Sequence, residues 1–220
     1  MDSKTRDYSE NRTKVWEVLC KSFFCKYISV DSSIVDIGAG NCNFINAIQA
    51  TRKAAVDKDS NIMLHANNDI NICIARVPPL SMFKDNSFDI VFSSNMIEHL
   101  ENKAEVMIFI KELCRICKPT GKCILMFPNV KYTKEFWDCF EHKVPLTNKT
   151  ITELENVIPI KVTETIPRFL PYQMGDSTSK TIKLPFIEHL VWLYLKLPML
   201  WRVFGKQCVI VFEKVQNETV

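Results

Sequence analysis

The feature that most constrains the fold is a short apolar strand that ends in two closely spaced glycines. Residues 33–37 (SIVDI) form a nearly continuous apolar run, and Gly38 and Gly40 follow it directly, ahead of a helical segment at residues 44–50. Glycine at such a junction lets the backbone turn sharply and approach a ligand closely. The chain has only five glycines, so two within one turn mark a special backbone requirement.

The segments around this junction alternate between strands and helices. Most predicted strands are continuous apolar runs, which is typical of a parallel sheet covered on both faces. We therefore expect an α/β fold with a mostly parallel sheet and helices on both faces. The further strands are predicted at residues 54–57, 70–75, 88–93, 122–127, 158–163 and 207–212, and the longer helices at residues 9–28 and 104–118.

Length and composition fit a single globular domain. The 220 residues are 47% hydrophobic and 24% charged, which excludes a disordered or collagen-like chain. The net charge of +3 is too small to indicate nucleic-acid binding. Six basic against two acidic side chains give the insert at residues 167–206 a charge of +4. We expect four parts: an N-terminal helix at residues 1–29, a cofactor-binding core at 30–166, a helical insert or substrate lid at 167–206, and a final strand and tail at 207–220.

The cysteines and the apolar runs point to a cytoplasmic protein. The nine cysteines are an odd number, and the polar N-terminus resembles no signal peptide, so we expect reduced thiols. Cys114 and Cys117 form a single CxxC in a helical segment that residues 119–121 (PTG) are expected to end. We interpret them as buried helix cysteines and predict no metal site. The apolar stretch at residues 184–204 is interrupted by charges and proline, which favours a buried or interfacial helix over a membrane span.

Two acidic residues near the glycine turn indicate the cofactor. Asp57 ends the second strand, where a carboxylate can accept both hydroxyls of a ribose. Asp36 lies two residues before Gly38 and would repel the pyrophosphate of a dinucleotide. It suits the sulfonium and ammonium groups of S-adenosylmethionine instead. Asn43 occupies the third glycine position of G-x-G-x-x-G, which also favours the methyl donor over NAD.

Several segments resemble, in order and spacing, the class I S-adenosylmethionine-dependent methyltransferases, with a type 11-like pattern. They are VDIGAGNCNFI, AVDKDS, DNSFDIVFSSNMIEHL and the helix–KPTGK–strand unit. The resemblance covers about residues 30–130 and implies a Rossmann-like, seven-stranded sheet whose last strand runs antiparallel beside the fifth. The remaining chain is similar to a bacterial branch of the superfamily that is often associated with surface-saccharide pathways.

The resemblance also implies which residues contact S-adenosylmethionine. The glycine turn would hold its methionine end, Asp57 its ribose, and the loop at residues 93–99 would line the cofactor and face the acceptor. Two departures stand out: Cys42 replaces a common third glycine, and residues 75–79 offer no acid to the adenine amine. The predicted cofactor contacts are Asp36, Gly38, Gly40, Asp57 and Asn95.

Histidines are the candidate bases, because a hydroxyl acceptor needs a base that works near neutral pH. His99 lies in the predicted cofactor loop and is either that base or a structural residue at the start of the next helix. Asp138 and His142 would share a helix face if the segment between them is helical. They then form either an acid–base dyad or a solvated pair. His65 and His189 receive no chemical role.

These features predict a methyltransferase that acts on a small-molecule, saccharide or lipid-linked acceptor. A catalytically inactive module with the same fold and a nucleotide-dependent oxidoreductase are the alternatives. Nucleic-acid methylation is not expected, because Ser-Ser-Asn-Met stands where an Asn/Asp-Pro-Pro-Tyr/Phe motif would follow the fourth strand. The basic, apolar insert could close over an anionic or lipid-linked acceptor or rest on a membrane surface. The sequence does not indicate an oligomeric state.

Overall fold

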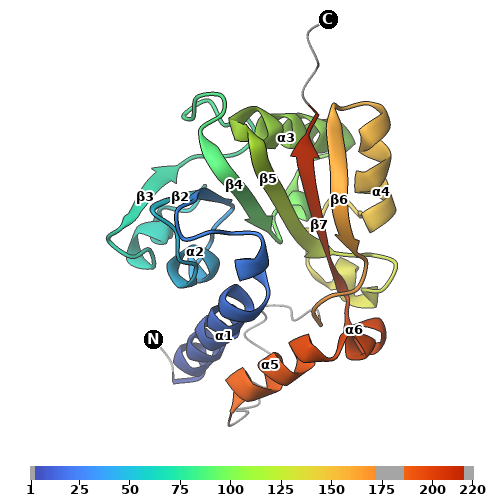
Figure 1. Cartoon of the computed structure of the whole chain (residues 1–220). Helices are drawn as coiled ribbons and strands as arrows, with labels where there is room; N and C mark the ends of the chain where they lie inside the picture. Colours follow the sequence, from blue (N-terminus) through green and yellow to red (C-terminus); the bar gives the residue numbers. More distant parts are fainter. Residues whose placement is uncertain (1–2, 172–185, 216–220) are drawn as a thin grey trace, which may run out of the picture.

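A seven-stranded sheet forms the centre of the computed structural model, which describes residues 3–171 and 186–215 (Figure 1). The strand order is β3-β2-β1-β4-β5-β7-β6, and β7 runs antiparallel to both of its neighbours. The predicted fold class, including the antiparallel last strand beside the fifth, is confirmed. The strands are β1 (Ser33–Ile37), β2 (Arg52–Asp57), β3 (Ile70–Ile74), β4 (Phe88–Ser94), β5 (Cys117–Pro128), β6 (Ile160–Ile166) and β7 (Gln207–Lys214).

Helices cover both faces of this sheet. Because side chains alternate along a strand, β1 sends Ile34 to one core and Val35 to the other. Phe109 of α3 packs in the core with Val35, whereas Leu19 of α1 and Ile45 of α2 pack in the core with Ile34. The helices are α1 (Ser3–Ser22), α2 (Asn43–Ala47), α3 (Lys103–Ile116), α4 (Asn148–Glu153), α5 (Ile187–Lys196) and α6 (Pro198–Phe204).

The junction between α3 and β5 differs from the sequence expectation. The helix ends at Ile116, and β5 begins at Cys117, so residues 119–121 lie inside a strand and do not end the helix. A Cβ on Gly121 would lie 2.5 Å from the backbone oxygen of Asp89. Glycine at this position therefore permits close approach of β4 and β5.

Helix α1 and the two helices of the insert, α5 and α6, lie beside the edge at which the parallel strands end (Figure 1). The predicted N-terminal helix is α1, which begins and ends earlier than expected and is followed by a 3-10 turn at Phe24–Lys26. Figure 1 shows α5 next to α1, and Lys14 forms a 3.5 Å ion pair with Glu188. The lid role of the insert stays a prediction, and its residues 172–185 lie outside the described residues.

The predicted helical placement of the CxxC pair is confirmed for Cys114 but not for Cys117. All nine cysteines are free. Cys114 is buried in α3, and Cys117 is buried at the first residue of β5, one residue beyond the helix. Within the described residues, no helix combines the length and apolarity needed to cross a bilayer.

Candidate active site

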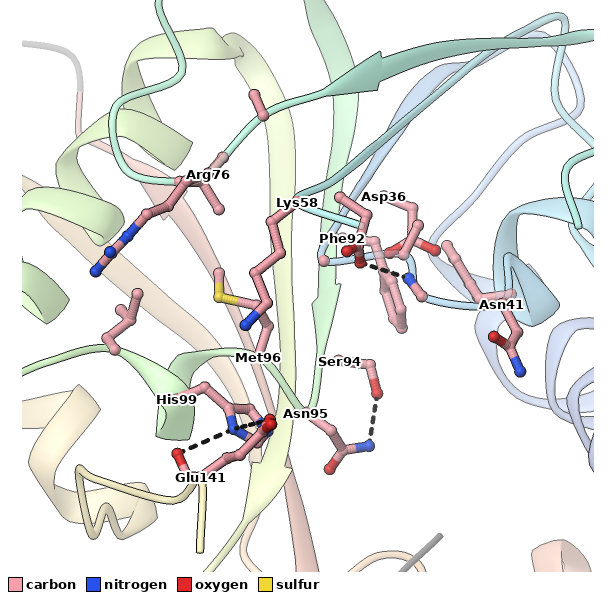
Figure 2. Close-up of a pocket in the computed structure, with 18 of the residues that line it drawn as sticks. Asp36, Asn41, Lys58, Arg76, Phe92, Ser94, Asn95, Met96, His99 and Glu141 are labelled. Carbon is pink, nitrogen blue, oxygen red and sulfur yellow. Dashed lines mark hydrogen bonds and ion pairs between the residues drawn. The ribbon is translucent and has the colours of Figure 1, made fainter. Parts of the chain in front are cut away.

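A cavity of about 560 Å³ opens at the carboxyl ends of β1, β2 and β4 (Figure 2). This edge is where open α/β sheets bind their ligands. The loops after these strands supply most of the wall, and α1 adds Arg12 and Trp16. All five predicted cofactor contacts line the cavity: Asp36, Gly38, Gly40, Asp57 and Asn95.

The glycine turn has the backbone that its sequence predicts. Gly38 has φ +76° and Gly40 has φ +50°, which are left-handed conformations that favour glycine. The Gly38 amide donates to the carbonyl of Val56 at 2.8 Å, which fastens the turn to the end of β2. A Cβ on Gly38 would lie 2.5 Å from Cγ of Met96, whereas a Cβ on Gly40 would meet nothing within 4 Å. The first glycine is therefore required by packing as well as by backbone conformation.

Cys42 does not narrow this cavity. Its φ of +56° is left-handed, and its side chain is fully buried in the core around α1 and α2. The neighbouring Asn41 and Asn43 line the cavity, but Cys42 does not. The replacement of glycine by cysteine thus leaves the cofactor space open, and it gives no support to the inactive-module alternative.

Asp57 links the end of β2 to the glycine turn. Its Oδ2 accepts a hydrogen bond from the Gly40 amide at 2.8 Å, and its Oδ1 accepts from the Asp59 amide at 2.9 Å. Each carboxylate oxygen can accept a second hydrogen bond. Both oxygens are therefore positioned at the cavity wall with capacity to accept ribose hydroxyls.

Asp36 makes the cavity favourable for a cation. Its carboxyl is 3% exposed and lines the cavity. Burial, and then repulsion from Asp57, hold the pKa of Asp36 well above its usual value. A positive ligand beside the two carboxyl groups would offset both effects. The residues present therefore fit S-adenosylmethionine, whose sulfonium and ammonium groups supply such charges.

The side of the cavity that the sequence predicts to hold adenine is formed by the residues after β3. Ala75, Arg76 and Val77 line the wall, as expected from their place in the sequence. The Ala75 amide donates to the backbone oxygen of Asp57 at 2.8 Å. This segment contributes no acid, so adenine would rely on backbone and apolar contacts.

Asn95 is hydrogen-bonded to β7, the last strand along the chain. Its φ is +51°, and its amide donates to the carbonyl of Met126 at 2.8 Å. Gln207, the first residue of β7, donates to Asn95 Oδ1 at 2.7 Å. Asn95 Nδ2 donates to Ser94 Oγ at 3.0 Å, as Figure 2 shows. Gln207 is a positioning residue that the sequence did not reveal, because it lies 112 positions from its partner.

His99 lies at the cavity wall and His142 lies behind it. The two rings are 4.9 Å apart between centroids. His99 Nδ1 donates to the backbone oxygen of Glu141 at 3.2 Å, and burial followed by the neighbouring His142 lowers the pKa of His99. His142 is 6% exposed and donates from Nδ1 to the backbone oxygen of Phe136 at 2.7 Å.

The predicted helical pairing of Asp138 with His142 is not formed. A 3-10 helix at Lys134–Asp138 ends at the aspartate, so the two residues do not follow each other on one helix face. Asp138 is exposed, whereas His142 is buried. His65 and His189, which received no role from the sequence, lie outside the cavity wall.

Several charged residues of the wall were not anticipated. Lys58 directly follows Asp57 at the end of β2 and points into the cavity (Figure 2). Arg76 and Lys143 both pair with Glu101, at 3.0 and 2.7 Å. Lys58 and Arg76 could have been found, because residues that follow β2 and β3 must reach this edge of the sheet.

Comparison with known proteins agrees with this geometry. A family model described as "Methyltransferase domain" matches residues 35–125, from β1 into β5. This match identifies a methyltransferase domain in the chain and supports the predicted class I S-adenosylmethionine-dependent methyltransferase superfamily. The match agrees with the predicted methyltransferase activity and with S-adenosylmethionine as its cofactor.

This methyltransferase domain is similar to the phosphoethanolamine N-methyltransferase of Plasmodium falciparum. The two are 25% identical over 171 residues, which cover 74% of this chain and 62% of the relative. The chain therefore spans less than two thirds of that relative.

Solved structures show the same fold. A chain in the complex of the Haloferax volcanii Trm112 methyltransferase activator with a methyltransferase superposes with TM-score 0.66 and 17% identity, covering 99% of this chain and 96% of that one. A SAM-dependent methyltransferase from Archaeoglobus fulgidus gives TM-score 0.63 and 16% identity, covering 92% and 94%.

Proposed function

We propose that this chain transfers a methyl group from S-adenosylmethionine to a small-molecule, saccharide or lipid-linked acceptor. The observation that carries the proposal is the buried carboxyl of Asp36, which faces the cavity beside Asp57 under the glycine turn. Two neighbouring carboxyl groups at the ligand-binding edge of the sheet favour a cationic ligand.

The cofactor, when bound, supplies a methyl carbon activated by its sulfonium. The chain itself would hold the methionine end at Asp36 and the glycine turn, and the ribose at Asp57. These contacts supply orientation and desolvation, which are the main requirements of an in-line displacement. In the proposed reaction, a lone pair of the acceptor would form the new bond to the methyl carbon, while the carbon–sulfur bond would break and leave its electron pair on sulfur.

His99 is the residue that would take the proton of a hydroxyl or ammonium acceptor. It lines the cavity, and its lowered pKa keeps the ring neutral near pH 7, which is the form that accepts a proton. Because Nδ1 donates to the backbone of Glu141, the lone pair of the neutral ring is on Nε2. His142 and Asp138 do not reach the cavity wall, so His99 is the stronger candidate base.

The surface of α5 and α6 supports an acceptor that carries a lipid or another apolar group. Met199 is 80% exposed, and the basic residues Lys196 and Arg202 are exposed on the same two helices. Apolar and basic residues together favour contact with an anionic lipid surface. The other exposed large apolar residues of these helices are Leu190, Trp192, Leu193, Val203 and Phe204.

Transfer of a labelled methyl group tests the enzymatic proposal. The purified chain is incubated with methyl-labelled S-adenosylmethionine and, separately, with small hydroxyl or amine compounds, free saccharides and lipid-linked saccharides. We expect label in one acceptor class and none with Asp36→Asn. If S-adenosylmethionine does not bind to the wild-type protein, the enzymatic proposal is wrong.

Liposome sedimentation tests the lipid-linked acceptor separately. We expect binding to vesicles with anionic lipid, weakened by Met199→Glu. Val30→Glu is the matched control, because Val30 is 59% exposed and lies before β1, outside α5 and α6. Equal binding of both variants, or no binding of the wild-type protein, would contradict this part.

A further inference from the structure

Glu98, His99 and His142 form a cluster of side chains behind the cavity wall. One ligand atom from each residue lies within 4.8 Å of the other two. Glu98 and His99 belong to the 3-10 turn Ile97–His99 after β4, and His142 lies ahead of α4. The amides of Lys143 and Val144 both donate to the backbone oxygen of Glu98, at 2.8 and 3.1 Å. These two bonds hold His142 against the turn.

The Glu98 carboxylate has no partner of its own in the described structure. The residue is 1% exposed, and neither carboxylate oxygen accepts a hydrogen bond. A buried carboxylate without a partner is costly, and such groups are usually paired or bound to a metal ion. The unpartnered oxygens are therefore suited to bind a cation.

Both histidines have the hydrogen-bond pattern that is typical of metal-binding histidines. Each donates from Nδ1 to a backbone oxygen, His99 to Glu141 at 3.2 Å and His142 to Phe136 at 2.7 Å. Such bonds fix the tautomer and the ring orientation of histidines that bind metals through the other nitrogen. In both rings the lone pair is then on Nε2.

We propose that Glu98, His99 and His142 bind one divalent transition-metal ion, with Zn²⁺ as the best match. Two imidazoles and one carboxylate form the ligand set of open zinc sites and of some non-haem iron sites. Bonds of about 2.0–2.2 Å place tetrahedral ligand atoms roughly 3.3–3.6 Å apart. The present ligand atoms lie within 4.8 Å of one another, so they have to approach each other by up to about 1.2–1.5 Å. His99 is half-buried at the wall, so its side chain can make that movement.

The location of the ion gives it a role in the proposed methyl transfer, on which this step rests. Since His99 lines the cavity, the proposed ion would lie next to the space in which an acceptor is held. A metal ion lowers the pKa of a bound hydroxyl. Because Nε2 of His99 would then bind the metal instead of acting as the base, the acceptor would release its proton to solvent. Its oxygen would then bond to the methyl carbon as the carbon–sulfur bond breaks. An oxygen acceptor is therefore favoured over a carbon acceptor.

Metal uptake without any acceptor tests the site. The full-length protein is stripped with a chelator, dialysed against Zn²⁺ and analysed for metal per chain. We expect about one equivalent in the wild-type protein and at least about a tenfold loss in Glu98→Gln and His142→Ala, because each removes a ligand. The controls His65→Ala and Cys114→Ala should keep the metal. Uptake equal to wild type in Glu98→Gln and His142→Ala, or none in the wild type, would overturn the proposal.

Two further measurements establish whether the variants fold and which side chains bind the metal. Titration with S-adenosylhomocysteine shows whether each variant is folded, and we expect affinities within about twofold of the wild type for variants outside the cofactor contacts. If the variants do not fold, Co²⁺ is added to the wild-type protein. Its absorption should lack the near-ultraviolet charge-transfer band of thiolate ligands, and the presence of that band would place the metal at cysteines and overturn the proposal. Loss of metal with intact methyl transfer would refute the role and leave the proposed function standing.

Discussion

The structure indicates by how much Gly38→Ala should lower the free energy of unfolding. In Gly38→Ala the new Cβ would lie 2.5 Å from Cγ and 2.7 Å from Cβ of Met96, at a backbone φ of +76°. The left-handed conformation costs an L-residue about 1–2 kcal/mol, and overpacking costs about 1–3 kcal/mol more. The free energy of unfolding should therefore fall by about 2–5 kcal/mol.

Gly40→Ala is the matched control for this substitution. Gly40 has a similar left-handed φ of +50°, but a Cβ there would meet nothing within 4 Å. Only the cost of the left-handed backbone conformation, about 1–2 kcal/mol, remains for this variant. Urea unfolding of the two variants and the wild type measures the difference. Equal destabilisation by both substitutions would refute the role of Met96 in requiring glycine at position 38.

Three further predictions concern the cofactor and the sheet. Since burial and Asp57 raise the pKa of Asp36, binding of a cation releases a proton, so calorimetry should show S-adenosylmethionine affinity rising with pH in the wild type and constant in Asp36→Asn. Gln207→Ala removes the 2.7 Å hydrogen bond to Asn95 and should weaken cofactor binding by about 1 kcal/mol in the same assay. Burial opposes ionisation of Asp89, but hydrogen bonds from Lys118 and Ser33 prevail and lower its pKa to about 2. Asp89→Asn should therefore cost about 1 kcal/mol in urea unfolding near neutral pH, after allowance for partial exposure, and the difference should vanish as the pH falls toward 2.

The sheet and the cofactor side of the site could be predicted because their signals are local. A continuous apolar run identifies a buried strand, and each strand end must reach the same edge of a parallel sheet. The glycine turn and Asp57 were therefore placed correctly at the cavity wall. The prediction that Gly121 helps to end a helix was wrong. Glycine is needed there because the backbone of Asp89 in the neighbouring strand lies close to it.

The acceptor side depends on contacts that the sequence does not reveal. The pairing of Asp138 with His142 presumed a helix, but the 3-10 turn ends at Asp138. The side chain of Cys42 points away from the cavity because its backbone has a left-handed φ. The glycine motif in the sequence does not indicate that orientation. Glu98 is buried, and residues 143 and 144, more than 40 positions along the chain, bond to its backbone oxygen, so its environment became visible only in three dimensions.

Binding of S-adenosylhomocysteine to the wild-type protein and to Asp57→Ala tests the central claim most directly. Asp57 can accept ribose hydroxyls while it holds the Gly40 amide at 2.8 Å, and a hydrogen bond to a charged group contributes about 1.5–3 kcal/mol. Calorimetry should therefore show one site in the wild type and an affinity lower by about tenfold to a hundredfold in the variant. No binding by the wild type at millimolar ligand, or unchanged affinity in Asp57→Ala, would contradict the assignment of this cavity to the cofactor.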